Sequence, residues 1–359
     1  MPFFNQLKNQ GFYVKHYYSN SVLSAKGYGS ILYSLYPMYK GSLLSQDTLT
    51  PYGLHNIFKH NGYSLMGIFS EKSYQNLFSE KGFDDAYLVD HPVDDVFKND
   101  WGVDDRFLYQ SLFRRLDEKQ ETGTLSQPVF NLVITLYSHT PFDVPEERRY
   151  HYKTPQTLDQ KYKNSFALSD EGLTYFFDEL KKRDYLDNSV VIIVGDHGYP
   201  LGNHGITKTE TGIYDESYRV PFLMLWPNQL PPTRIKPEDN VYSHVDVAPT
   251  LIDLLHLEVD QTAFVGQSML KTNKNPTLLI QPYGGYHFQS IRYPYKYRKH
   301  ISMNREFVYD LSKDPLENTS IINDIDPVLL HQFRNDIMTL FENQILLETN
   351  RIYPNTQSK

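Results

Sequence analysis

Three short and almost uninterrupted apolar runs constrain the fold of this chain more than any other feature. They occupy residues 129–136 (VFNLVITL), 190–194 (VVIIV) and 220–226 (VPFLMLW). Apolar runs of this length are typical of strands buried on both faces of a parallel sheet, whereas strands with one wet face alternate apolar and polar residues. We therefore expect three strands of a sheet that helices cover on both sides.

The segment between the first two runs predicts a helix at residues 166–185. Leu173, Phe176, Phe177 and Leu180 recur at helical spacing, and a cluster of basic residues fills the last turn, where cations suit the helix dipole. Strand, helix and strand in this order predict a right-handed crossover and a doubly wound α/β sheet. Ligands of such sheets lie beyond the carboxyl ends of the strands, so the residues after each run are the first candidates for a site.

Composition excludes several classes of protein. The 359 residues carry a net charge of −8 and no stripe of Lys and Arg, which excludes nucleic-acid binding through phosphate neutralisation. The absence of cysteine excludes disulfides, thiolate zinc sites and a Cys nucleophile. No apolar run approaches the roughly 20 residues of a membrane span, and the first residues lack a signal-peptide core. The chain as given is expected to be soluble.

The strongest chemical motif follows the second run directly, in GDHGYPLGNHGITK at residues 195–208. Asp196 and His197 stand at the expected carboxyl end of the strand, and a carboxylate beside an imidazole suits a divalent cation. An Asp-His pair alone favours a polar turn with an incidental histidine.

The longer pattern D-H-G-x-x-L-G-x-H-G-x-x-K resembles the second metal-binding segment of sulfatases in the alkaline phosphatase superfamily. The resemblance implies that Asp196 and His197 bind one divalent metal ion, manganese by first expectation, with calcium, magnesium or zinc as alternatives. It also implies that His204 and Lys208 line the pocket, where Lys208 would pair with an anionic ester. A solvated loop lysine and a packed histidine are the structural alternatives.

Segments further along the chain extend the resemblance. Residues 243–255 (SHVDVAPTLIDLL), 264–270 and 307–318 (FVYDLSKDPLEN) are similar to the closing segments and C-terminal subdomain of sulfatases. Asp246, Asp310 and Asp314 are expected to form caps and turns, and His244 is expected to pack at a helix start. A final helix is predicted at residues 327–349.

Two upstream segments resemble the lipoteichoic acid synthases and phosphoglycerol transferases of the same superfamily. SHTPF at residues 138–142 is similar to a segment whose His contacts the substrate head group, which implies this role for His139. The segment 98–108 (KNDWGVDDRFL) makes Trp101 a candidate for the pocket wall, with a core tryptophan as the equal alternative.

The nucleophile is expected at Ser24, in the segment YSNSVLSAKGYGSILYSLYP at residues 18–37. Both the sulfatase and the transferase patterns align their nucleophile with this serine. Lys26, Gly27 and Tyr28 replace the Pro, Ser and Arg of the sulfatase pattern, so conversion to formylglycine is not expected. A plain serine that opens a helix and is activated by the metal is the simplest mechanism, while helix capping is the structural alternative.

The resemblance begins with PFFNQL at residue 2, one segment after the strand that supplies a further carboxylate ligand in this superfamily. The chain is therefore expected to be N-terminally truncated and to lack its first strand. Relatives on the transferase side imply a membrane-anchored parent that works on the extracytoplasmic face, with membrane association only through the absent region. Loss of an anionic ligand would weaken metal binding and could leave the chain inactive.

These observations predict an α/β, alkaline phosphatase-like, doubly wound and mostly parallel sheet with helices on both faces. A catalytic domain is expected at residues 1–275 and a small C-terminal subdomain at 276–359. The leading functional hypothesis is a metal-dependent phosphotransferase or phosphodiesterase for phosphoglycerol or phosphoethanolamine head groups. The alternatives are a sulfuric ester hydrolase and an inactive remnant, and the expected partner is an anionic ester on a lipid or glycan.

Overall fold

The computed structural model describes residues 1–44, 51–89, 98–99, 102–227, 229–230, 240–259, 263–271, 275–283 and 286–349. Its contacts divide the chain into two compact units whose segments alternate along the sequence. The first unit comprises Met1–Tyr13, Phe58–Ile192 and Leu223–Arg234, and the second comprises Val14–Ile57, Ile193–Phe222 and Ile235–Lys359. The boundary expected at residue 275 stays a prediction.

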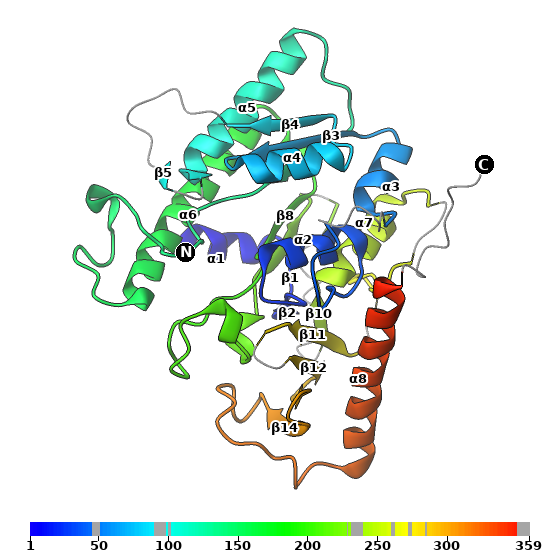
Figure 1. Cartoon of the computed structure of the whole chain (residues 1–359). Helices are drawn as coiled ribbons and strands as arrows, with labels where there is room; N and C mark the ends of the chain where they lie inside the picture. The colour runs from blue at the N-terminus through cyan, green and yellow to red at the C-terminus, as the bar shows by residue number, and fades with distance from the viewer. Residues whose placement is uncertain are drawn as a thin grey trace. The chain divides into compact units, whose positions relative to one another are not determined.

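A parallel sheet forms the centre of the first unit. Strand β3 (Ser64–Phe69) pairs in parallel with β4 (Asp85–Leu88) on one side and with β7 (Val129–Val133) on the other. Helix α4 (Lys72–Glu80) connects β3 to β4 and packs against both strands, as Figure 1 shows. A short hairpin, β5 (Lys98–Asn99) and β6 (Gly102–Val103), precedes helix α5 (Asp105–Glu121).

Helix α6 (Leu158–Lys182) is the longest helix of the first unit and starts earlier than the predicted residue 166. The Thr157 hydroxyl accepts a hydrogen bond from the Gln160 backbone and caps this earlier start. Helix α6 packs against α5 and against the N-terminal helix α1 (Pro2–Lys8). The backbone N–H groups of Phe3 and Phe4 both donate to the Asp170 carboxylate, so an α6 side chain caps α1.

The remaining two apolar runs form β8 (Val191–Val194) and β9 (Phe222–Leu225), which share a sheet with β1 (Phe12–Tyr13) in the order β1-β9-β8. The prediction of burial on both faces is confirmed for β9, where each side chain is at most 3 % exposed. It is wrong for β7 and β8, whose side chains are mostly half-buried. Each of these strands is the last in its sheet among the described residues, so no neighbouring strand covers its outer edge.

The second unit contains the elements around the Asp-His motif. Strand β2 (His16–Tyr18) pairs in parallel with β10 (Val241–Ser243). Helix α2 (Ser24–Tyr33) follows β2, and the short helix η5 (His244–Asp246) leads into α7 (Val247–Leu255). Helix α2 packs on both η5 and α7. Helix α3 (Leu54–His60) begins in a segment of the second unit and ends in a segment of the first.

A four-stranded antiparallel sheet completes the second unit. Its strands, in order, are β11 (Thr277–Gln281), β12 (His287–Arg292), β13 (Tyr295–His300) and β14 (Arg305–Asp310). Helix α8 (Pro327–Glu348) packs on β11 and β12 and confirms the predicted final helix (Figure 1). One sheet face forms an apolar core with α8, whereas the other buries polar side chains, among them Gln289, Lys296 and Arg298.

Two expectations about local structure are confirmed. Asp246 forms a capping box with Ser243, and Asp310 and Asp314 accept hydrogen bonds within turns. His244 packs at the start of η5 and is fully buried. Among the described residues, no helix combines the length and the hydropathy needed to cross a membrane.

Candidate active site

The structure brings Ser24, Asp196 and His197 together within the second unit. Asp196 and His197 follow β8, and Ser24 is the first residue of α2. The Ser24 hydroxyl lies 3.3 Å from Nε2 of His197, and Oδ2 of Asp196 lies 3.8 Å from the same nitrogen. The side chains of Asp196 and His197 are 30 % and 17 % exposed, so the group is open to solvent.

Ser24 does not use its hydroxyl as a helix cap. The N-cap residue of α2 is Leu23, and no side chain caps this helix end. Because the first turn of a helix leaves backbone N–H groups without intrahelical acceptors, the hydroxyl stands where an anion is favoured. Lys26 points away from this position, since its ammonium donates to the carbonyls of Met38 and Gly41. Burial lowers the pKa of Lys26 to about 8.

Three neighbours fix the backbone of the Asp-His turn. The Ser19 hydroxyl lies 2.7 Å from both the Asp196 and the Ser21 carbonyl oxygens, which share its one proton, and Nε2 of His244 contacts the Gly195 carbonyl at 2.8 Å. Gly27 of α2 approaches so closely that a Cβ there would lie 2.4 Å from the Asp196 carbonyl oxygen. His244 donates through Nε2 as a neutral ring, because burial lowers its pKa to about 4. The sequence motifs gave no signal for the role of Ser19.

The orientation of His197 leaves one nitrogen available for chemistry. Its Nδ1 contacts the Gly198 carbonyl at 2.8 Å and must donate to it, so Nε2 is the ring nitrogen that faces Ser24 and Asp196. Burial would raise the pKa of Asp196, but the His197 ring, the Ser24 hydroxyl and the His197 backbone N–H together hold it below its ordinary value. Asp196 is therefore the anionic group of the cluster.

This donor set fits a divalent cation in part. A carboxylate, an imidazole nitrogen and a hydroxyl oxygen face one another, and the second ring nitrogen of His197 is fixed by a carbonyl, as metal-binding histidines require. No cluster of three or more His, Asp or Glu side chains suited to a metal occurs within the described ranges. Three protein donors leave coordination positions for water and substrate oxygens.

His204 and Lys208, the predicted pocket residues, differ in their surroundings. The His204 ring uses both nitrogens, with Nδ1 2.7 Å from the Glu216 carboxylate and Nε2 2.5 Å from the Leu316 carbonyl. Lys208 precedes the short helix η3 (Thr209–Thr211) and is exposed. Their roles at the substrate stay predictions.

His139 belongs to the first unit, and its role at the site stays a prediction. It lies in the loop after β7, half-buried, with Nδ1 2.6 Å from the Thr140 carbonyl. This loop is held by Asp105, which accepts hydrogen bonds from the backbones of Leu136 and Tyr137. Trp101, the predicted pocket wall, lies outside the described residues.

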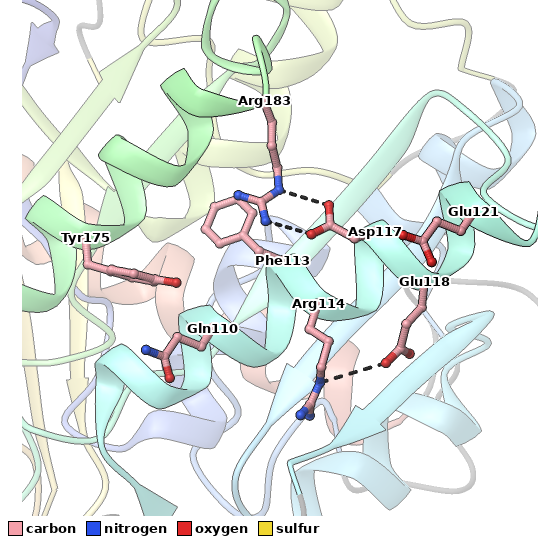
Figure 2. A pocket seen from close by; sticks show the side chains of 8 residues that line it. All are labelled: Gln110, Phe113, Arg114, Asp117, Glu118, Glu121, Tyr175 and Arg183. Atoms are coloured by element: carbon pink, nitrogen blue, oxygen red, sulfur yellow. Dashed lines mark hydrogen bonds and ion pairs between the residues drawn. The ribbon is translucent and has the colours of Figure 1, made fainter.

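Surface hollows do not mark the site. Figure 2 shows a hollow of 310 Å³ between α5 and α6 of the first unit. Ion pairs line it, with Arg183 against Asp117 at 2.6 Å and Arg114 against Glu118 at 3.9 Å. None of the predicted site residues lines this hollow, so the site is recognised by its chemistry rather than by its depth.

Comparisons with known sequences identify the family of the chain. The sulfatase family pattern matches residues 1–257, and that of the N-sulphoglucosamine sulphohydrolase C-terminal region matches residues 202–342. The lipoteichoic acid synthase-like YvgJ of Bacillus subtilis is 26 % identical over 78 % of this chain and 47 % of its own length. An arylsulfatase of Clostridium perfringens is 25 % identical over 76 % of this chain and 68 % of its own length. The chain thus spans about half the length of its synthase-like relative.

Solved structures share the fold. A protein of the alkaline phosphatase superfamily from Vibrio parahaemolyticus superposes with a TM-score of 0.77 at 18 % identity, over 99 % of this chain and 83 % of that one. The lipoteichoic acid synthase LtaP of Listeria monocytogenes gives a TM-score of 0.64 at 19 % identity, over 87 % and 81 %. The expected alkaline phosphatase-like α/β fold is confirmed. The chain belongs to the sulfatase family, in the branch that includes the lipoteichoic acid synthase-like proteins.

Proposed function

We propose that this protein is a phosphotransferase or phosphodiesterase that acts on phosphoglycerol- or phosphoethanolamine-type head groups, with Ser24 as the nucleophile. The observation that carries the proposal is the 3.3 Å approach of the Ser24 hydroxyl to the His197 nitrogen, at the N-terminus of α2 and beside the Asp196 carboxylate. Proteins of this family generally use a divalent metal ion, and we propose Mn²⁺ bound by these three side chains.

The proposed reaction has two displacements at phosphorus. The bound ion would lower the pKa of the Ser24 hydroxyl and neutralise charge on the ester oxygens. Ser24 Oγ forms a bond to phosphorus while the bond to the leaving alcohol breaks, and the proton that Ser24 loses is returned to the departing oxygen. Water or an acceptor hydroxyl then attacks the phosphoserine and restores the free serine. The backbone N–H groups of the first turn of α2 would stabilise the charge on the non-bridging oxygens.

The second candidate is a sulfuric ester hydrolase. It is favoured by the match of residues 202–342 to a sulphohydrolase C-terminal region and by the arylsulfatase relative. It is disfavoured by the residues after Ser24, because Lys26, Gly27 and Tyr28 replace the Pro, Ser and Arg of the sulfatase pattern. We further propose that the substrate is a lipid or glycan ester met on the extracytoplasmic face of the membrane, as for the synthase-like relatives.

Steady-state assays with bis(p-nitrophenyl) phosphate and p-nitrophenyl sulfate in the presence of Mn²⁺ test this function. We expect faster turnover of the phosphate diester and a loss of about a hundredfold or more in Ser24→Ala, since removal of a nucleophile removes the covalent route. Ser79→Ala, an exposed serine on α4, is the matched control and should retain wild-type rates.

Peptide mass spectrometry after a rapid quench should locate a phosphoryl adduct on Ser24. Faster turnover of the sulfate would favour the sulfatase. No turnover, no adduct and no Mn²⁺ binding that depends on Asp196 would mean an inactive remnant.

A further inference from the structure

His204 contacts two acceptors at once, which restricts its protonation state. Its Nδ1 lies 2.7 Å from a Glu216 carboxylate oxygen, and its Nε2 lies 2.5 Å from the Leu316 carbonyl oxygen. Neither a carboxylate nor a carbonyl can donate a hydrogen bond, and a neutral imidazole carries only one N–H. Both contacts are hydrogen bonds only if the ring carries two N–H groups, which is the imidazolium form.

We propose that His204 is a positioning residue, held as an imidazolium, that fastens the loop carrying Lys208 to the turn at residues 314–317. This assignment replaces the substrate contact implied by the sequence resemblance. Its effect on catalysis rests on the proposed function, whereas the charge state and the fastening do not.

The ring is also held through its faces. The Tyr214 ring stacks on His204 with centroids 3.7 Å apart and an angle of 9° between the planes. The side chain of His204 is only 10 % exposed. A ring that stacks on one neighbour and is bonded at both nitrogens has one orientation. His204 therefore holds the loop in place by its shape as well as by its charge.

Charges on every neighbouring element agree with a cation at this position. Glu216, on the short helix η4 (Asp215–Ser217), accepts directly, and Glu317 contributes from the following turn. Strand β13 places Lys296 2.9 Å from Glu317, and Arg298 5.0 Å from the Tyr214 ring. Together with Asp215, 3.5 Å from Lys296, the cluster places three carboxyl groups beside two basic side chains and the His204 ring.

The direction of the pKa shift agrees with this geometry. Burial alone would lower the pKa of His204, but the Glu216 carboxylate, the Leu316 carbonyl and Glu317 outweigh it and raise the pKa above the ordinary value of 6.5. A histidine with a raised pKa stabilises the fold at low pH and loses this contribution as the pH rises through the folded-state pKa. The fastening should therefore release as the pH rises through the raised pKa of His204.

His204 attaches the first half of the loop, residues 199–208, to the turn at residues 314–317. The second half is held separately, since Glu317 accepts from the Asp215 backbone at 2.6 Å and Gln281 donates to the Gly212 carbonyl at 2.5 Å. Lys208 lies between these two attachments. Release of His204 should therefore free residues 199–208, including Lys208, without unfolding the four-stranded sheet.

Nitrogen-15 NMR of histidine-labelled protein tests the charge state directly, and His204→Gln identifies the signal. We expect the doubly protonated ring to predominate at pH 6.5, where an ordinary imidazole is half neutral. Glu216→Gln should move the titration of His204 to lower pH, because a carboxylate acceptor is replaced by a neutral amide. Detection of a mostly neutral His204 ring at pH 6.5 in the wild-type protein would overturn the proposal.

Hydrogen exchange tests the fastening. In His204→Gln, exchange at residues 199–208 should rise by about tenfold or more, while the amides of β11–β14 stay protected. His204→Arg, which keeps a charged double donor, should restore protection and remove its pH dependence. His331→Gln, an exposed histidine on α8, is the control and should exchange like the wild type. Equal exchange in wild type and His204→Gln would contradict the fastening.

Kinetics then separate this inference from the proposed function. His204→Gln should lower kcat/KM for the phosphate diester by about tenfold, mainly through KM, and should remove any fall in kcat/KM that accompanies loss of the His204 proton. If wild-type protein turns over no ester, the proposed function fails while NMR and exchange still decide the role of His204. If the wild type is active and His204→Gln has unchanged kinetics, the loop attachment has no catalytic role.

Discussion

Hydrogen bonds to single backbone atoms determine where the Asp196 carboxylate lies. The Ser19 hydroxyl shares its proton between the Asp196 and Ser21 carbonyl oxygens, each at 2.7 Å, and the His244 ring contacts the adjacent Gly195 carbonyl at 2.8 Å. Ser19 and His244 are both fully buried. Neither side chain is proposed to bind the metal. Both hold the backbone beside Asp196, the proposed ligand, as the outer hydrogen bonds of metal sites commonly do.

Replacement of Ser19 by alanine should weaken the metal site. The variant leaves the buried Asp196 carbonyl without this donor, so we expect a loss of about 1–2 kcal/mol in the free energy of unfolding and of about tenfold or more in Mn²⁺ affinity. Urea unfolding and titration calorimetry measure the two effects.

Ser21→Ala is the matched control, because the Ser21 hydroxyl donates to the Ile280 carbonyl and is equally buried. It should lose similar stability without the loss of Mn²⁺ affinity. Equal affinities in the two variants would show that the Ser19 contact does not position Asp196.

The close packing of helix α2 on the Asp-His turn is the decisive contact between elements. Gly27 lies in the first turns of α2, where an added Cβ would be 2.4 Å from the Asp196 carbonyl oxygen and 3.2 Å from its carbon. Backbone atoms cannot move aside as a flexible side chain can. Glycine at this position is therefore required by the approach of the two segments, although glycine disfavours a helix.

Gly27→Ala tests this packing. Alanine favours a helix by about 1 kcal/mol over glycine, yet we expect Gly27→Ala to lower both the thermal midpoint and the esterase rate, because α2 must shift from Asp196.

Gly29→Ala is the control in the same helix, since its Cβ would meet the Leu43 side chain at 3.3 Å. It should be neutral or slightly stabilising. Stabilisation by Gly27→Ala with full activity would refute a tight contact between α2 and the turn.

At the same scale, the sequence predicted where strands lie better than how they are buried. The runs at residues 129–136 and 190–194 form β7 and β8, but their side chains are mostly half-buried because burial depends on the neighbouring strand and not on the run itself. The sheet β11–β14 was not predicted. In β13, aromatic and basic residues alternate, which is typical of a strand with a solvated face, yet Lys296 and Arg298 are buried.

For the candidate site, the motifs predicted which side chains come together but not the residues that support them. Ser24, Asp196 and His197 come together as expected. The contacts of His204 could not be foreseen, because its partner Leu316 lies 112 positions away and binds through its backbone. A carbonyl acceptor has no sequence signature.

The chain as a whole alternates between its two compact units, which sequence patterns alone could not predict. The order of segments places Met1–Tyr13 with Phe58–Ile192, and Val14–Ile57 with Ile193–Phe222. Each unit contains a fully buried carboxyl group whose pKa burial raises, to about 6 for Asp105 and to about 7 for Asp246. The stability of the molecule should therefore depend on pH well above the ordinary range of carboxyl groups.

Asp105→Asn isolates the contribution of Asp105, in the first unit, to the pH dependence of the free energy of unfolding. Asp105 accepts from the Leu136 and Tyr137 backbones through one oxygen, which an asparagine can reproduce. Between the ordinary pKa of 3.8 and the folded value of about 6, the folded state keeps a proton that the unfolded chain releases. Wild-type stability from this group is complete below 3.8 and is lost as the pH rises through 6.

The variant lacks this titration, so its free energy of unfolding relative to wild type should rise between pH 4 and pH 7 by on the order of 2 kcal/mol. Urea unfolding at several pH values measures the difference. Asp187 is an exposed aspartate in the same unit, and the free energy of unfolding of Asp187→Asn should change with pH as that of the wild type does. A constant difference between Asp105→Asn and wild type across this window would mean that Asp105 is already ionised in the folded protein at pH 4. The loop that carries His139 would then be held by a charged carboxylate rather than by a neutral acid.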